Sequence, residues 1–250
     1  RTFDMHAPFP EEMNRVLTAR VTDLHFAATE WAADNLLREG INPESIQVTG
    51  NTGIDAVLSI YDGIERGRLS GLSLPIDTRK KLIVVTAHRR ESFGEAFARI
   101  CEAISTLAQR EDVQVVWPVH LNPNVQNTVH NILGRHSNVL LVEPIDYLPF
   151  VDLMRRAYLL VTDSGGVQEE GPSLGKPILV LRDKTERPEA VRAGTVKLVG
   201  TNRDTIISEA TRLLDDSTEY ERMAHLHNPY GDGKASGRIA GRIFSYLNPA

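Results

Sequence analysis

From residue 81 onward, short apolar runs alternate with segments whose apolar residues recur every three to four positions. This pattern predicts β-strands joined by amphipathic helices, which is typical of βαβ units on a parallel sheet. Phe93, Phe97, Ile100, Ile104 and Leu107, for example, mark the buried face of one helix. The six expected strands cover residues 82–87, 113–119, 139–142, 158–162, 177–181 and 196–199. We therefore expect a doubly wound α/β sheet with helices on both faces.

The first 50 residues repeat this alternation in a shorter form. The expected elements are a helix over residues 11–20, a strand over 24–27, a helix over 29–39 and a strand over 46–49. Two parallel strands leave both faces and both edges without partners, so they do not make a stable sheet by themselves. The sequence also begins with Arg1 in place of Met. We therefore expect residues 1–50 to be the C-terminal part of a first domain whose opening part precedes this sequence.

The turn residues suggest the remaining domain boundaries. Residues 51–74, which contain Gly63, Gly67 and Gly71, are expected to connect the first domain to a complete second domain over residues 75–230. The last segment, residues 231–250, carries apolar residues at helical spacing after a Gly-rich turn. We expect it to form a helix that crosses back to the first domain.

The composition excludes several classes of protein. A chain of 250 residues with 41% hydrophobic residues and a net charge of −5 is typical of a soluble globular protein. No run of Lys and Arg supplies the clustered cations of a nucleic-acid-binding surface, and no apolar stretch approaches the roughly 18 residues of a membrane span. Cys101, the single cysteine, cannot form an internal disulfide, which fits a cytoplasmic protein. Small molecules and other proteins are the expected partners.

Ligands of open α/β sheets bind beyond the carboxyl ends of the strands, so the residues after each apolar run are the first candidates. Ser164, Gly165 and Gly166 follow the fourth expected strand and precede a helix. Glycines let the backbone approach a phosphate, and the amides at a helix start favour an anion such as a diphosphate. Glu169 and Glu170 belong to the same helix, where one of them is placed to bond ribose hydroxyls. The alternative is a tight turn followed by glutamates that stabilise a helix N-terminus.

Cationic side chains follow other strands of the same sheet. His88 and Arg89 come after the first expected strand, His120 after the second and Arg187 after the fifth. An imidazole changes charge near neutral pH, so His88 can donate a proton to a departing phosphate oxygen. The alternative is a structural histidine beside solvated arginines. The three loops that carry Ser164, His88 and Arg187 lie at one sheet edge, and together they favour an anion site. His120 lies at the same edge, with a structural role as its alternative.

The sequence offers no metal or cofactor site. His225 and His227 have the spacing of metal ligands, but no cluster of Cys or carboxylate residues accompanies them. Ser164 lacks the Gly-x-Ser-x-Gly surroundings of a hydrolase nucleophile. No Gly-x-Gly-x-x-Gly motif or Walker lysine supports a nicotinamide or ATP site. We expect neither a metal nor a cofactor.

Several motifs, in one order along nearly the whole chain, resemble the non-hydrolysing UDP-N-acetylglucosamine 2-epimerases of bacterial polysaccharide synthesis. The motifs are Pro10-Glu11-Glu12-Met13-Asn14-Arg15, Val48-Thr49-Gly50-Asn51-Thr52, Thr86-Ala87-His88-Arg89-Arg90-Glu91, Pro118-Val119-His120-Leu121-Asn122-Pro123, Thr162-Asp163-Ser164-Gly165-Gly166-Val167-Gln168-Glu169-Glu170, Thr185-Glu186-Arg187-Pro188-Glu189 and Asn228-Pro229-Tyr230-Gly231-Asp232-Gly233. The resemblance implies an α/β fold with two Rossmann-like domains of glycosyltransferase-B type and a cleft between them, the first domain being incomplete here.

The resemblance also implies where UDP binds. UDP is expected against the second domain, with Ser164, Gly165 and Gly166 at the diphosphate. Glu170 is expected at the ribose and Phe150 beside the uracil. Base recognition is expected to rely on backbone groups, because an isoleucine, residue 145, stands where some members of the family have a Gln.

The catalytic residues implied by the resemblance come from both domains. Glu11 and Arg15 are expected to approach the sugar from the first domain, and His88 and Arg187 to lie near the phosphates. The family reaction is reversible: it inverts carbon 2 to give UDP-N-acetylmannosamine, through anti elimination of UDP, a 2-acetamidoglucal intermediate and re-addition. A family segment, Glu-Ala-Gly-Leu-Arg-Thr, is present only as its last two residues, so its glutamate would precede residue 1. We expect the chain by itself to lack epimerase activity.

A regulatory role is a further implication of the resemblance. Glu12, Arg89 and His120 match positions that bind a second UDP-N-acetylglucosamine as an effector in some relatives, although all three can equally be structural. Family members are commonly homodimers, so a cytoplasmic homodimer that binds UDP-N-acetylglucosamine and UDP is expected.

Three other functions stay open at this point. A UDP-sugar glycosyltransferase would share the Ser-Gly-Gly turn and the helix carboxylate, but it would not need the motif that begins at Pro10. A hydrolysing epimerase would release N-acetylmannosamine and free UDP. A fragment that binds UDP without catalysis is the third alternative.

Overall fold

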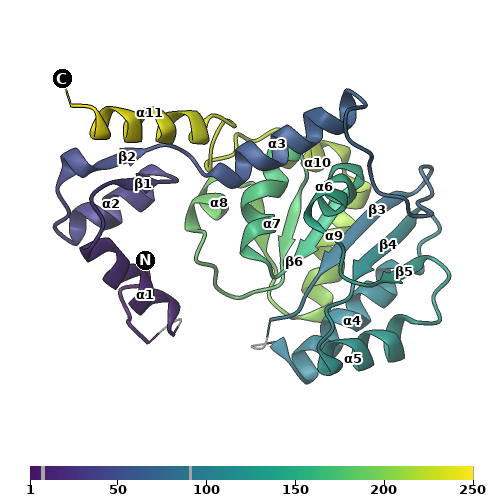
Figure 1. Cartoon of the computed structure of the whole chain (residues 1–250). Coiled ribbons are helices and arrows are strands. Elements are labelled where there is room, and N and C mark those ends of the chain that lie inside the picture. Colours follow the sequence, from purple (N-terminus) through teal and green to yellow (C-terminus); the bar gives the residue numbers. More distant parts are fainter. Residues whose placement is uncertain (7–8, 90–91, 250) are drawn as a thin grey trace. The chain divides into compact units, whose positions relative to one another are not determined.

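The computed structural model describes residues 1–6, 9–89 and 92–249, which form two compact units (Figure 1). Unit 1 comprises Arg1–Ser59 and Pro229–Ala250, and unit 2 comprises Ile60–Asn228. The connection expected over residues 51–74 begins with a helix, α3 (Thr52–Glu65), that spans the boundary between the units.

Unit 2 is built on a sheet of six parallel strands in the order β5-β4-β3-β6-β7-β8. The strands are β3 (Lys81–Thr86), β4 (Val113–Pro118), β5 (Val139–Val142), β6 (Leu159–Thr162), β7 (Ile178–Val180) and β8 (Val196–Leu198). Each lies within one residue of the apolar run that predicted it, so the expected strands are confirmed. The chain winds outward from β3 to one edge and from β6 to the other. The two strands therefore meet at a switch point, where open α/β sheets bind their ligands.

Helices cover both faces of this sheet, because alternate strand residues face opposite sides. Ile83 and Val85 belong to one buried cluster with apolar residues of α4 (Glu95–Leu107), α5 (Pro123–Leu133) and α9 (Arg203–Asp215). Leu82 and Val84, buried outside that cluster, face the side of α6 (Tyr147–Arg156) and α7 (Gly165–Glu170) (Figure 1). The remaining helices of unit 2 are the 3₁₀ helix η3 (Gly171–Leu174), α8 (Pro188–Ala193) and α10 (Ser217–Ala224). The predicted doubly wound sheet is therefore present.

An aromatic cluster fills the α4 side of the core. The ring of Phe97 meets that of Trp117 edge-on, with centroids 6.0 Å apart, and that of Phe93 at 6.4 Å. Cys101 is fully buried in the same cluster, and burial raises the pKa of its thiol to about 12. A thiol in this state is inert, so Cys101 has a packing role.

Asparagine side chains cap the starts of α5 and α9. The side chain of Asn122 accepts a hydrogen bond from the backbone N–H of Asn124, and α5 then begins with Pro123. Asn202 accepts from the N–H of Thr205 at the start of α9. These side chains satisfy N–H groups that a helix leaves without a partner in its first turn, which fixes where each helix begins.

Unit 1 contains a two-stranded parallel sheet of β1 (His25–Ala27) and β2 (Ile46–Val48), with His25 opposite Ile46. Its first helices are α1 (Glu11–Arg20), α2 (Glu30–Arg38) and the 3₁₀ helix η1 (Pro43–Ser45). Thr29 caps α2 by accepting from the N–H of Ala32.

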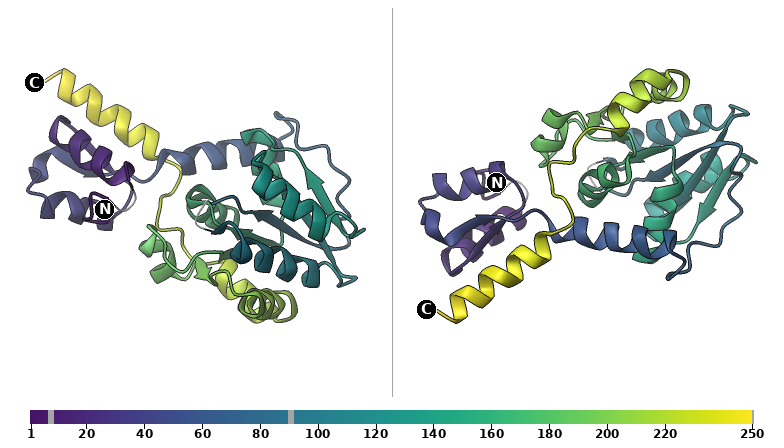
Figure 2. Two further views of the ribbon diagram at one scale, coloured as in Figure 1. Left: turned by 90° about the horizontal axis from the view of Figure 1, so that it is seen from below. Right: turned by 90° about the horizontal axis from the view of Figure 1, so that it is seen from above.

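The helix expected near the end of the chain is α11 (Ala235–Leu247), which lies beside the two-stranded sheet of unit 1 (Figure 2). Its first two N–H groups, of Ala235 and Ser236, donate to the Asp55 carboxylate at 3.0 and 2.7 Å. Further along, Arg242 donates to the carbonyl of Glu44 at 2.9 Å. These bonds attach α11 to α3 and to the segment before β2. Within the described residues, no helix has the length and apolar character that crossing a membrane requires.

Candidate active site

A pocket of about 230 Å³ opens at the carboxyl ends of β3, β4 and β6 in unit 2. It therefore lies at the switch point of the sheet, where the strand order predicts a ligand site. The pocket brings together four residues that the sequence analysis selected: His88, His120, Phe150 and Ser164. The rest of its lining is Thr86, Pro118, Pro144, Ile145 and Val167.

Hydrogen bonds join the ends of the neighbouring strands β3 and β6 beside this pocket. The hydroxyls of Thr86 and Thr162, the last residues of β3 and β6, lie 2.6 Å apart. Asp163, only 1% exposed, follows Thr162 and accepts hydrogen bonds from the backbone N–H groups of His88 and Arg89, both at 2.7 Å. The loop after β3 is therefore held by the residue that follows β6. Arg90 and Glu91, which continue the predicted motif, lie outside the described residues.

Two histidines stack in the pocket. The rings of His88 and His120 are nearly parallel, at 8°, with centroids 5.2 Å apart. The Nδ1 atom of His120 accepts from the backbone N–H of Asn122 at 3.1 Å, so the hydrogen of its neutral ring is on Nε2. The Nδ1 atom of His88 lies 3.6 Å from a carboxylate oxygen of Asp163. The stack fixes the plane of the His88 ring.

Arg187 lies directly on the turn that starts α7. A Cβ atom built on Gly165 would stand 2.5 Å from the Arg187 Cζ, a distance at which two carbons overlap. Only glycine therefore allows the guanidinium to rest against this backbone, where the first amides of α7 begin. The Nε atom of Arg187 donates to Glu169 at 2.8 Å, which orients the side chain. Sequence analysis selected both Gly165 and Arg187, and the structure places them in contact.

A buried glutamine holds the loop that carries Arg187. Gln168, with no exposed surface, donates to the carbonyl of Ser164 at 3.1 Å and accepts from the hydroxyl of Thr185 at 2.7 Å. The same hydroxyl oxygen accepts from the Arg187 N–H at 3.2 Å. The loop before α8 is thereby attached to α7. Gln168 and Thr185 stand in the motifs of the sequence analysis, but no role was predicted for them.

Glu169 and Glu170, the last two residues of α7, have different partners. Glu169 pairs with Arg187, whereas the carboxylate of Glu170 is hydrogen-bonded to the hydroxyl of Tyr147 at the start of α6. Burial raises the pKa of Glu170 to about 7, and the charge of Glu169 adds to this, against the hydrogen bond from Tyr147. Sequence analysis gave both glutamates as candidates to bind a ribose. Arg187 forms its ion pair with Glu169 and not with Glu170. Sequence analysis missed Tyr147.

The other predicted residues lie on α1 in unit 1. Glu11 is exposed, and Arg15 pairs with Glu12 at 3.1 Å. The Glu12 carboxylate is completely buried and also accepts from the N–H groups of Thr2 and Phe3, at 2.9 and 3.0 Å. Burial by itself would raise the pKa of Glu12, but these hydrogen bonds and Arg15 outweigh it and lower the pKa. Glu12 therefore holds the first residues of the chain on α1.

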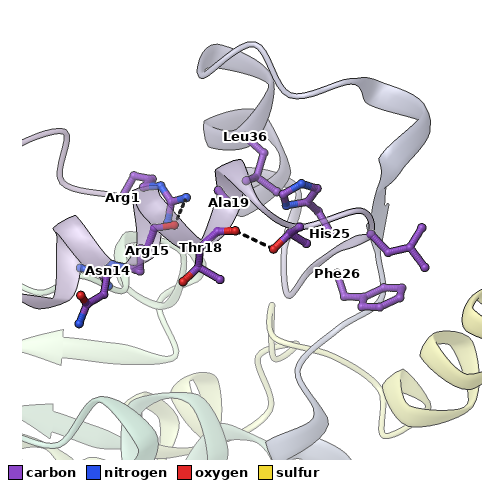
Figure 3. A pocket seen from close by; sticks show the side chains of 10 residues that line it. Arg1, Asn14, Arg15, Thr18, Ala19, His25, Phe26 and Leu36 are labelled. Carbon is purple, nitrogen blue, oxygen red and sulfur yellow. Dashed lines mark hydrogen bonds between the residues drawn. The ribbon is translucent and has the colours of Figure 1, made fainter.

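Unit 1 has a pocket of its own, of about 430 Å³, that sequence analysis did not predict (Figure 3). Arg15 lines it from α1, His25 and Phe26 from β1, and Leu36 from α2. The Arg1 guanidinium crosses from α1 to α2: it donates to the carbonyl of Arg15 at 3.2 Å and pairs with Glu39, the residue after α2, at 2.6 Å. The predicted residues thus fall into two sets, one in each unit.

Comparison with known proteins identifies the family. The sequence model of the family described as UDP-N-acetylglucosamine 2-epimerase matches residues 1–243. The chain belongs to this family. Among curated UDP-N-acetylglucosamine 2-epimerases, the protein of Escherichia coli K12 is 54% identical over 245 residues, which are 96% of this chain. The chain spans 65% of the length of that relative.

Solved structures of UDP-N-acetylglucosamine 2-epimerases have the same fold. The enzyme of Neisseria meningitidis, bound to UDP-GlcNAc, is 46% identical with a TM-score of 0.89, over 98% of this chain and 67% of that chain. The S. aureus MnaA–UDP structure is 43% identical with a TM-score of 0.88, over 100% of this chain and 68% of that chain. These matches confirm the predicted α/β class of glycosyltransferase-B type.

The epimerase-family pocket has no metal-binding cluster in the part of the chain that the structure describes, since no group of three or more His, Cys, Asp or Glu there is arranged to hold an ion. His88 lines the pocket, and Arg187 lies against Gly165. His88 was found because it follows β3 closely, and Arg187 because it lies in the loop between β7 and α8. The effector roles of Glu12, Arg89 and His120 stay a prediction.

Proposed function

We propose that the protein catalyses the reversible 2-epimerisation of UDP-N-acetylglucosamine to UDP-N-acetylmannosamine. Its membership of the family and its 54% identity to the curated E. coli epimerase support this activity. The observation that carries it is the Arg187 guanidinium resting on Gly165 at the edge where His88 also lies. Cations and helix-start amides at one sheet edge suit a diphosphate.

The nucleotide is proposed to bind along the residues of this edge. Ser164, Gly165, Gly166 and Arg187 bind the diphosphate, and Glu170 accepts hydrogen bonds from the ribose. The apolar side chains of Phe150 and Ile145 line the pocket beside the uracil, whose polar edge then bonds to backbone groups. Solved relatives hold UDP-GlcNAc or UDP, which is the chemistry that this pocket would take.

The proposed reaction begins with an anti elimination. A base takes the hydrogen of carbon 2 as a proton, and the electron pair of that C–H bond forms the double bond between carbons 1 and 2. The bond between carbon 1 and the diphosphate oxygen breaks, and its electron pair leaves with UDP. Re-addition of UDP to carbon 1 and of a proton to the other face of carbon 2 gives the epimer. His88 and Arg187 would stabilise the leaving diphosphate. The catalytic roles of Glu11 and Arg15 stay predictions.

The test is to incubate the protein with UDP-N-acetylglucosamine in heavy water. We expect UDP-N-acetylmannosamine with deuterium at carbon 2 from the full-length protein, because the proton that returns comes from solvent. Residues 1–250 by themselves, assayed in parallel, are expected to give none, since the chain spans 65% of the length of the curated relative. Free N-acetylmannosamine with UDP would indicate a hydrolysing epimerase, and sugar transfer to an acceptor a glycosyltransferase. Binding of UDP with no turnover would leave only the UDP-binding function.

The pKa of Glu170 predicts how nucleotide binding depends on pH. A ribose hydroxyl donates to an ionised carboxylate better than to a neutral one. With a pKa of about 7, the ionised fraction of Glu170 rises about tenfold between pH 6 and pH 8. The affinity for UDP-N-acetylglucosamine should therefore rise about tenfold over this range and then level off. Calorimetric titration over this range measures the rise. Glu170→Gln should remove it, and a wild-type affinity that falls with pH would refute the ribose assignment.

We also propose that the protein is a cytoplasmic homodimer. The single cysteine is buried and inert, so the fold requires no oxidising compartment. Sedimentation equilibrium should give twice the mass of the chain, and a monomer at micromolar concentration would argue against the dimer.

A further inference from the structure

The two carboxylate oxygens of Asp163 have different surroundings. Oδ2 accepts from two successive backbone N–H groups, those of His88 and Arg89, both at 2.7 Å. Oδ1 is buried, and no donor in the described part of the chain reaches it within hydrogen-bond distance. The ring atom facing it is Nδ1 of His88, at 3.6 Å. A buried carboxylate oxygen without a donor is unfavourable, so a hydrogen bond at this point would stabilise the site.

The packing of His88 restricts how its ring can move. The parallel ring of His120 lies on one face of His88, so the ring can shift within its own plane more readily than it can tilt. Such a shift of less than about 1 Å would bring Nδ1 to the usual distance of an N–H···O bond, about 2.8–2.9 Å. The Nδ1 atom of His120 cannot donate to Asp163 instead, since it already accepts a hydrogen bond from the N–H of Asn122.

We propose that Asp163 is a positioning residue for His88: Oδ1 of Asp163 accepts a hydrogen bond from Nδ1–H of His88, and Nε2 is thereby directed to the pocket. This inference rests on the proposed function, in which His88 acts on the leaving diphosphate. The carboxylate stabilises the imidazolium and fixes its orientation. In the elimination, Nε2–H donates to the departing oxygen of UDP, whereas the Nδ1 hydrogen stays on the ring and Asp163 stays ionised.

Asp163→Asn tests the inference because it replaces the oxygen that faces His88 with an NH₂ group. The other oxygen is kept as an acceptor. The amide oxygen can accept from the N–H groups of His88 and Arg89, as Oδ2 does. The amide NH₂ then faces His88 and can only donate, so Nδ1 must become an acceptor and the hydrogen moves to Nε2. The ring of the variant keeps a hydrogen on Nε2 but lacks the positive charge that Asp163 stabilises, so it is a weaker donor to the departing oxygen. We therefore expect kcat for epimerisation to fall about 10²- to 10⁴-fold, with KM changed less than about threefold.

Nitrogen NMR of ¹⁵N-histidine-labelled protein shows directly which ring nitrogen of His88 carries a hydrogen. In the wild type, with or without UDP, Nδ1 of His88 should carry a hydrogen, and in Asp163→Asn it should not; His88→Gln assigns the signal. Asp216→Asn is the matched control, because Oδ1 of Asp216 likewise accepts from two successive N–H groups, of Thr218 and Glu219, at the start of α10. It should leave both the His88 signal and kcat unchanged.

A wild-type Nδ1 without hydrogen in both states would overturn the inference, and this measurement needs no variant to fold. An Asp163→Asn protein with wild-type kcat would overturn it as well. If the full-length wild type itself fails to epimerise, the proposed function fails. The NMR result then still decides whether Asp163 positions His88.

Discussion

Replacing Gly165 with alanine is expected to weaken UDP binding about 10- to 100-fold while the protein stays folded. The new Cβ would stand 2.5 Å from Cζ and 2.6 Å from Nη2 of Arg187. A guanidinium at the end of a flexible side chain can move away, so the fold is little affected. The ligand, however, loses a cation whose hydrogen bond is worth about 1.5–3 kcal/mol, which corresponds to that loss of affinity. Calorimetric titration with UDP measures the change.

Two further variants make this test specific. Gly237→Ala in α11, where a Cβ meets nothing within 4 Å, is the matched control and should bind UDP like the wild type. Gly165→Ala combined with Arg187→Ala should bind about as weakly as Arg187→Ala, because both act through one guanidinium. Unchanged affinity in Gly165→Ala would show that Arg187 does not bind the diphosphate from this position.

Phe97→Ala is expected to lower the free energy of unfolding by about 3–5 kcal/mol. Phe97 is 1% exposed, and its ring packs edge-on against those of Trp117 and Phe93, so alanine leaves a cavity in the core of unit 2. For a unit of this size, the loss corresponds to a melting temperature lower by about 6–20 °C. Urea unfolding followed by tryptophan fluorescence gives the free energy directly.

Leu121→Ala is the control for this stability measurement, since Leu121 is 63% exposed and its removal opens no cavity. It should change the free energy of unfolding by less than about 0.5 kcal/mol. If Phe97→Ala proved equally mild, the aromatic cluster would not be part of the cooperative core.

The strands of unit 2 could be predicted because both faces of a parallel sheet are covered. Their residues are then almost all apolar, and the runs end where the chain reaches the sheet edge. Helix α3 escaped prediction although Ile54 and Val57, one helical turn apart, are both buried in it. Three glycines at residues 63, 67 and 71 pointed to a connection, and tertiary packing overrode that local signal.

The candidate site could be predicted only in part. His88, Ser164 and Gly165 follow strands, so the strand-end rule finds them. The pairs Arg187–Glu169 and Tyr147–Glu170 join residues from different loops, and their contacts depend on loop conformations that no periodicity encodes. Glu12 shows the opposite difficulty. A glutamate in the first turn of a helix normally faces water. The burial of Glu12 depends on the N–H groups of Thr2 and Phe3, which donate to its carboxylate.

The division of the chain also constrains the order in which the protein folds during synthesis. Unit 2 is one uninterrupted stretch, whereas unit 1 is made of two stretches on either side of it. The bond from Ala235 to Asp55 closes a loop of 180 residues that contains the whole of unit 2. Because α11 leaves the ribosome after all of unit 2, the six-stranded sheet can form on the nascent chain before the other unit is complete. Until α11 arrives, α3 and the two-stranded sheet lack this partner.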